Sequence, residues 1–99
     1  MAEIFVGTEV KVSIDVTAQG FDMSTDPWTA TVRCGNQSTT YTKDTAINND
    51  GEWMICVDTA SLGAGIYDIV MEIDVPDNDM NDGYRHEVCK KQLMNVLRV

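Results

Sequence analysis

The chain has 99 residues, of which 16 are acidic and 7 basic, and its formal net charge is -9. This length suits one domain with a single core that buries about 65% of the unfolded chain's surface. The Lys and Arg residues are scattered along the sequence, which disfavours binding to nucleic acid or to an anionic membrane. No apolar run approaches the ~18 residues of a membrane span, and MAEIFVGTEV at the start lacks the features of a secretion signal.

The first strand is predicted at residues 10–16, where apolar and polar residues alternate after a short apolar lead-in at residues 4–6. Residues 18–27 are rich in turn formers and predict a loop. Within this loop, we expect Phe21 and Met23 to cap one end of the core, and exposed anchors for a partner are the alternative.

Alternation resumes at residues 28–34, which predict a second strand, and the hydroxyl-rich residues 38–43 predict a short strand at a sheet edge. Asp50 and Gly51 favour a hairpin turn with positive backbone angles. In the strand after that turn, Trp53, Ile55 and Val57 are expected to point inward, and the intervening residues to point outward.

The longest pattern is VDTASLGAGIYDIVMEIDV, residues 57–75. Its second half alternates from Tyr67 to Val75, which is typical of a strand with one face against a core. Before it, residues 58–64 predict a tight crossing segment that places Leu62 in the end of the core. Gly63 and Gly65 are expected to adopt backbone angles that other residues resist.

The chain then turns through the acidic residues 76–83 into a last run, residues 84–99. The apolar residues at its end follow neither a strand period nor a helical period. They are either a last strand buried on both faces or, within residues 89–99, an arm that docks on a neighbouring subunit.

About seven short strands separated by turn signals, with nothing helical, predict one all-β domain over residues 1–99, an antiparallel immunoglobulin-like β-sandwich. The expected core comprises Trp28, Val32, Trp53, Ile55, Leu62, Tyr67, Ile69 and Ile73.

Three aspartates of the acidic turn, Asp77, Asp79 and Asp82, form a weak calcium candidate. An EF-hand loop requires glycine at its sixth position and glutamate at its twelfth, where this chain has Asp82 and Val88. We therefore expect a structural turn whose side chains cap their own backbone, with no metal and no cofactor.

The remaining chemistry-bearing residues predict no enzyme. His86 and Glu87 are neighbours in a strand and point to opposite faces, and no nucleophile or phosphate-loop motif is present. Cys34, Cys56 and Cys89 lack metal-ligand spacing and are expected to be small apolar fillers, with a Cys34–Cys89 disulfide as the alternative.

The segments FVGTEVKVSI, VDTASLGAG and above all IDVPDNDMNDGYRHEV resemble the immunoglobulin-like domains of virion proteins from tailed phages and prophages of Bacteroidota, including the crAss-like group. The resemblance runs from the first strand to about Val88. Valine stands here where the family has isoleucine before Pro76, and the tail is richer in apolar residues than the resemblance leads us to expect.

The resemblance implies a non-enzymatic structural protein, most readily an auxiliary or decorating capsid protein that is made in the bacterial host cytoplasm and resides in the virion. Its expected partners are the major capsid protein or neighbouring copies. A neck or tail component and a surface-glycan-binding module with Tyr41 or Tyr84 exposed are the alternatives. The apolar residues expected at the interface are Ile4, Phe5, Leu93, Met94, Val96 and Leu97.

Overall fold

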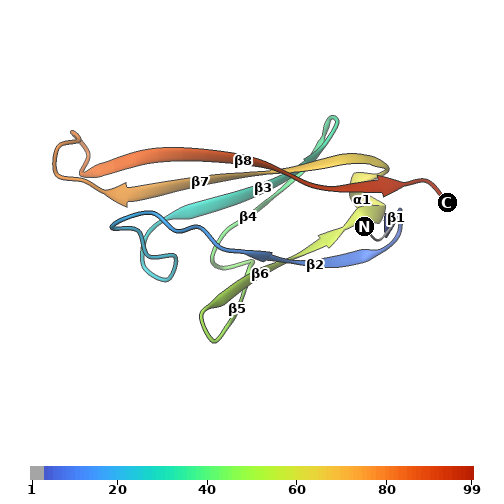
Figure 1. The fold of residues 1–99 in the computed structure, drawn as a ribbon, viewed down its shortest axis with the longest axis horizontal. Helices are drawn as coiled ribbons and strands as arrows, with labels where there is room; N and C mark the ends of the chain where they lie inside the picture. Colours follow the sequence, from blue (N-terminus) through green and yellow to red (C-terminus); the bar gives the residue numbers. More distant parts are fainter. Residues whose placement is uncertain (1–3) are drawn as a thin grey trace.

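The computed structural model describes residues 4–99, which form eight β-strands and one short helix (Figure 1). Their bounds are β1 Ile4–Phe5, β2 Glu9–Ile14, β3 Trp28–Cys34, β4 Gln37–Tyr41, β5 Ile47–Asn49, β6 Glu52–Asp58, α1 Thr59–Leu62, β7 Gly65–Pro76 and β8 Tyr84–Leu97. Within residues 4–99, no helix has the length and apolar character needed to cross a membrane.

The strands form two sheets, one of five strands in the order β1-β8-β7-β3-β4 and one of three in the order β2-β6-β5. The expected all-β, two-sheet architecture is confirmed, with eight strands where about seven were predicted. The expectation of a purely antiparallel fold is wrong at one place, because β1 pairs with β8 in parallel through Ile4 with Val96 and Phe5 with Leu97.

The core lies between the two sheets and contains all eight residues predicted for it. In β7, the inward face from Tyr67 to Val75 is buried at every second residue, as the alternation predicted. The rings of Trp28 from β3 and Trp53 from β6 meet edge to face with centroids 5.5 Å apart. Because these strands belong to different sheets, this aromatic pair ties the two layers together.

The crossing from β6 to β7 contains a four-residue helix, α1, where the sequence predicted nothing helical. Asp58 caps it by accepting a hydrogen bond from the Ala60 N–H at 3.0 Å, and Leu62 is buried as expected. Gly65 follows with φ of 140°, and a Cβ there would lie 3.1 Å from the Cys34 Sγ. The positive φ therefore favours glycine at this position, and a Cβ would also lie tightly against Cys34.

The turn and loop predictions hold in most details. Asp50 and Gly51 have φ of 55° and 88° and join β5 to β6 as a hairpin. In the loop before β3, Met23 is buried, and its carbonyl accepts a hydrogen bond from the Trp28 Nε1–H at 2.9 Å. Phe21 packs partly buried against the core, so this loop is a cap.

The tail is the last strand of the domain's own sheet, because β8 pairs with β7 along its length from Tyr84 to Val96. Val96 is buried, so an arm made of residues 89–99 that leaves the domain does not describe this structure. The molecule is elongated, 51 × 29 × 23 Å, with the acidic turn at one end and β1 with the C-terminus at the other (Figure 1).

Candidate functional site

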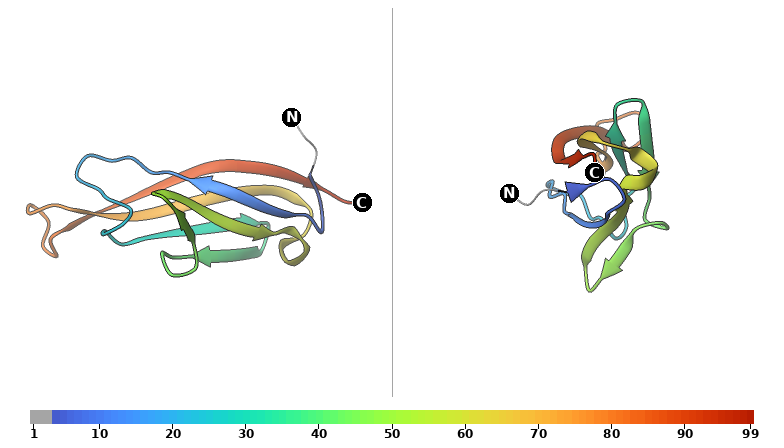
Figure 2. Two further views of the ribbon diagram at one scale, coloured as in Figure 1. Left: turned by 90° about the horizontal axis from the view of Figure 1, so that it is seen from below. Right: turned by 90° about the vertical axis from the view of Figure 1, so that its right-hand side faces the viewer.

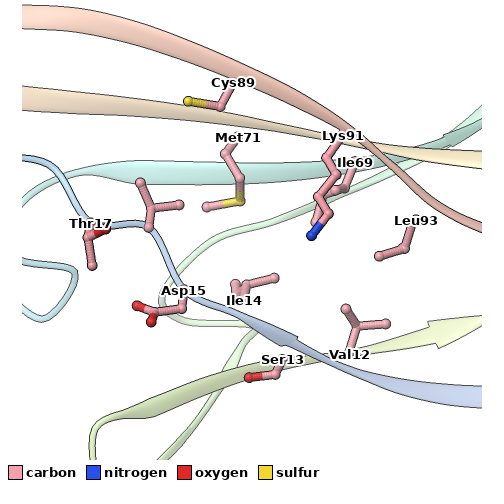
Figure 3. Close-up of a pocket in the computed structure, with 11 residues that line it drawn as sticks. Val12, Ser13, Ile14, Asp15, Thr17, Ile69, Met71, Cys89, Lys91 and Leu93 are labelled. Atoms are coloured by element: carbon pink, nitrogen blue, oxygen red, sulfur yellow. The ribbon is translucent and has the colours of Figure 1, made fainter.

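A surface groove of about 310 Å³ lies between β2 of one sheet and β7 and β8 of the other (Figure 3). Its lining residues are Val12, Ser13, Ile14, Asp15, Val16, Thr17, Ile69, Met71, Cys89, Lys91 and Leu93. Met71, Lys91 and Leu93 point toward β2, and Val12 and Ile14 point back toward them. The groove is therefore mostly apolar, with Lys91 as its one basic and Asp15 as its one acidic lining residue.

The groove forms where an edge strand of one sheet lies beside an edge of the other sheet. Within the described residues 4–99, β2 pairs only with β6, and β8 pairs with β1 only at Val96 and Leu97. β2 and β8 run along the same side of the molecule (Figure 2). Among residues 4–99, no strand continues β1 along β8, so two strand edges flank an apolar gap between the sheets.

The side chains on the inner face of β8 are mostly charged, and for this reason they do not fill the gap between the sheets. The cross-strand partners of the buried β7 residues place Arg85, Glu87, Cys89 and Lys91 on this face, since paired residues point to the same side. Arg85 is engaged by Asp77 at 2.7 Å and by Glu87 at 2.8 Å. No carboxylate of residues 4–99 forms an ion pair with Lys91.

The outer face of β7 and β8 carries a second set of charges. His86 lies opposite Asp74, with 2.9 Å between Nδ1 and Oδ1, and its Nε2 lies 3.8 Å from Glu72. The hydrogen bond to Asp74 and the two negative charges raise the pKa of His86 above its ordinary value of 6.5. Further along this face, Lys90 lies 3.8 Å from Asp68.

The acidic turn uses its carboxylates on its own backbone. Asp77 accepts a hydrogen bond from the Asp79 N–H at 3.0 Å, and Asp82 accepts one from the Tyr84 N–H at 3.0 Å. The Asp79 hydrogen bond, and then the bond from Arg85, lower the pKa of Asp77. Residues 4–99 contain no group of three or more His, Cys, Asp or Glu side chains arranged to hold a metal.

The predicted interface residues divide into two kinds. Val96 is buried in the domain's own core, so its prediction as an interface residue is wrong. Ile4, Leu93 and Met94 are partly buried and pack against the core, and Leu97 is also partly buried. Phe5, at 41% exposed, is therefore the one residue of the set that presents a large apolar surface.

The cysteine and tyrosine predictions also divide. All three cysteines are free, which excludes the Cys34–Cys89 disulfide; Cys34 is buried, whereas Cys56 and Cys89 are exposed and so are not core fillers. Tyr41 is buried, and its hydroxyl donates to the Cys56 carbonyl at 2.8 Å, so it is not the exposed ring that the glycan-binding alternative requires. Burial also raises the pKa of Tyr41. Tyr84 is exposed.

Comparisons with protein-family models, with curated proteins and with solved structures find no match for this chain.

Local sequence patterns predict neither of two features of this region. The groove brings β2 together with β8, which lies more than 70 residues later, and no local pattern reports such a meeting. The other is Thr59, fully buried, whose hydroxyl donates to the Thr8 carbonyl at 2.7 Å and accepts from the Gly7 N–H at 2.9 Å. These bonds fix the turn between β1 and β2, and so fix where β2 begins beside the groove.

Proposed function

We propose that this chain is a non-enzymatic structural protein of a tailed-phage virion, an auxiliary capsid protein with an immunoglobulin-like fold that binds the assembled shell through its free strand edge. The observation that carries the proposal is the edge of β8 from residue 84 to residue 95, which no strand of residues 4–99 pairs with and which lies alongside the groove. Backbone groups on such an edge can bind an added strand without any catalytic apparatus.

The strand order supports the immunoglobulin-like part of the proposal. Strands β8-β7-β3-β4 and β2-β6-β5 have the order G-F-C-C′ and B-E-D of that fold. Tyr67, near the start of β7, donates its hydroxyl to the carbonyl of Gly63, four residues earlier, as the tyrosine corner of immunoglobulin-like domains does. The resemblance of the segment IDVPDNDMNDGYRHEV to phage virion domains supports the virion part.

A glycan-binding module is less well supported. Flat stacking of sugars requires exposed aromatic rings close together, and of the two tyrosines considered only Tyr84 is exposed. A neck or tail position would use the same strand edge, and the location of the chain in a particle distinguishes it from a capsid position.

The test begins with particles purified from the bacterium that carries the gene. Quantitative mass spectrometry should find this chain at a fixed ratio to the major capsid protein, and electron microscopy should place it on the shell. Its absence from purified particles would overturn the proposal, and its presence at the neck or tail alone would replace the capsid assignment.

Binding through the β8 edge is tested by adding purified chain to particles that lack it. Val88→Asp changes an exposed residue of β8, and Ser38→Asp changes an exposed residue of β4 at the opposite edge of the same sheet. We expect Val88→Asp to weaken binding about tenfold or more and Ser38→Asp to leave it unchanged. Equal effects would show that the β8 edge is not the contact.

A further inference from the structure

The groove between β2 and β8 has the features of a site for one extended segment of a partner chain. We propose that it binds an acidic, alternating segment of a different protein, which adds to β8 and places a carboxylate on Lys91. This inference rests on the proposed function and names the chemistry of the partner that the edge would take.

The backbone of β8 has an edge that can pair with an added strand. β1 already pairs with β8 at its last two residues, so this edge accepts an added strand within the domain itself. From residue 84 to residue 95 the same edge has no partner among residues 4–99. The groove is lined by Cys89, Lys91 and Leu93 of β8 and by the six residues 12–17 on the β2 side, so the strand that would fill it has about six residues, ~20 Å at 3.3 Å per residue.

The groove favours apolar side chains on one face of the added strand. Alternate residues of a strand added to β8 would point between the sheets, because neighbouring strands share the same alternation. There they would meet Val12 and Ile14 of β2 and Met71 of β7, which line the groove. Apolar side chains at every second position therefore fit, and burying them supplies the apolar part of the binding free energy.

The charges of the chain are distributed unevenly around the groove. Residues 84–98 carry four of the chain's seven Lys and Arg residues but only one of its sixteen acidic residues. Residues 84–98 are therefore basic, although the protein as a whole is acidic. Arg85 and Lys90 already have carboxylate partners, whereas Lys91 has none among residues 4–99. Its ammonium group lies at the groove, and Asp15, the one acidic lining residue, forms no ion pair with it.

This charge distribution selects the occupant. Pairing β8 with β8 of a second copy would bring a second uncompensated Lys91 to the edge, and like charges facing each other destabilise a strand pair. Lysine at a free edge also discourages unspecific sheet extension. An acidic segment turns the same charges into attraction, so the edge admits one class of partner and rejects copies of itself.

The test uses two synthetic peptides. Each alternates valine at positions that face one side with threonine at positions that face the other, and the central valine is replaced by glutamate in one peptide and by lysine in the other. We expect the glutamate peptide to bind the full chain about tenfold or more tightly than the lysine peptide. We also expect amide protection from hydrogen exchange to rise in residues 84–95.

Charge variants locate the contact. Lys91→Glu should reverse the preference between the peptides, and Lys91→Gln should abolish it. Lys90→Glu makes the same change on the other face of β8 and should have a several-fold smaller effect than Lys91→Glu. Lys43 lies outside both β2 and β8, so Lys43→Glu should leave binding unchanged.

Three outcomes would overturn the inference: neither peptide binds, Lys91→Glu keeps the wild-type preference, or Lys90→Glu and Lys91→Glu have equal effects. A concentration-dependent dimer that Lys91→Glu disrupts would instead assign the groove to a second copy. Peptide binding by a chain that is absent from particles would retain the groove and reject the virion role. Particle binding without peptide binding would retain the virion role and reject the proposed use of the groove.

Discussion

The phenol of Tyr67 donates a hydrogen bond to the backbone carbonyl of Gly63, at the corner where the chain leaves α1 and enters β7. The Tyr67 side chain is fully buried, and burial raises its pKa. The bond therefore joins a core side chain to the crossing segment that connects the two sheets.

Removing this hydroxyl should destabilise the domain. Tyr67→Phe leaves the Gly63 carbonyl without its hydrogen bond, and we expect a loss of about 1 to 3 kcal/mol in the free energy of unfolding. Urea denaturation followed by tryptophan fluorescence measures it. Tyr84→Phe, at an exposed tyrosine, is the control and should change stability by less than about 0.5 kcal/mol. Equal stability of the two variants would contradict a structural role for the corner.

Leu62 closes the same end of the core from α1 and is 6% exposed. Leu62→Ala should cost ~2 to 5 kcal/mol because the packed surroundings collapse only partly into the space that it leaves. Thermal and urea unfolding check this value. Ile66→Ala, four residues later at a side chain that is 56% exposed, should have little effect. An unchanged melting temperature for Leu62→Ala would reject the packing described for this segment.

His86 should titrate above its ordinary pKa of 6.5, because Asp74 accepts a hydrogen bond from the charged ring. A raised folded-state pKa means that the ion pair stabilises the fold fully below the ordinary pKa, and that this contribution disappears as pH rises through the folded pKa. NMR titration of the His86 ring measures the pKa. Asp74→Asn should lower it, whereas Asp68→Asn, beside Lys90, should not; a wild-type value at or below 6.5 would refute the pairing.

Truncation separates the two interpretations of the tail. Deleting residues 92–99 removes Val96, which is buried and pairs with Gly65, so the domain should lose its cooperative thermal transition. Deleting only Arg98 and Val99, which are exposed and lie beyond β8, should leave the melting temperature unchanged. A native circular dichroism spectrum after the longer deletion would restore the arm.

Calcium should not alter stability. Both carboxylate oxygens of Asp77 already bind within the turn, one to the Asp79 N–H and the other to Arg85. A calcium ion would have to replace these bonds before it gained its own oxygen ligands. The melting temperature should therefore be equal in millimolar calcium and in chelator. A large increase with calcium that Asp79→Ala abolishes would identify a site there.

The sequence by itself determined the elements whose signals are local. Alternation from Tyr67 to Val75 reports which face is buried, since neighbouring side chains of a strand point to opposite sides. Asp50 and Gly51 report a hairpin because few residues adopt positive φ at low cost. Leu62 among small residues likewise marked the crossing between sheets.

Only the tertiary structure decided what lies between distant segments. Tyr41 is buried because its hydroxyl reaches the Cys56 carbonyl, a contact that no periodicity of a short polar strand reports. The tail is a strand because β7 is long enough to pair with all but its last residues. The groove exists because β8 places charged residues, Lys91 among them, on its inward face and because, among residues 4–99, only the two residues of β1 pair with its outer edge. Strand neighbours and free edges depend on pairing between residues far apart in sequence, and that information becomes available only when the sheets are assembled.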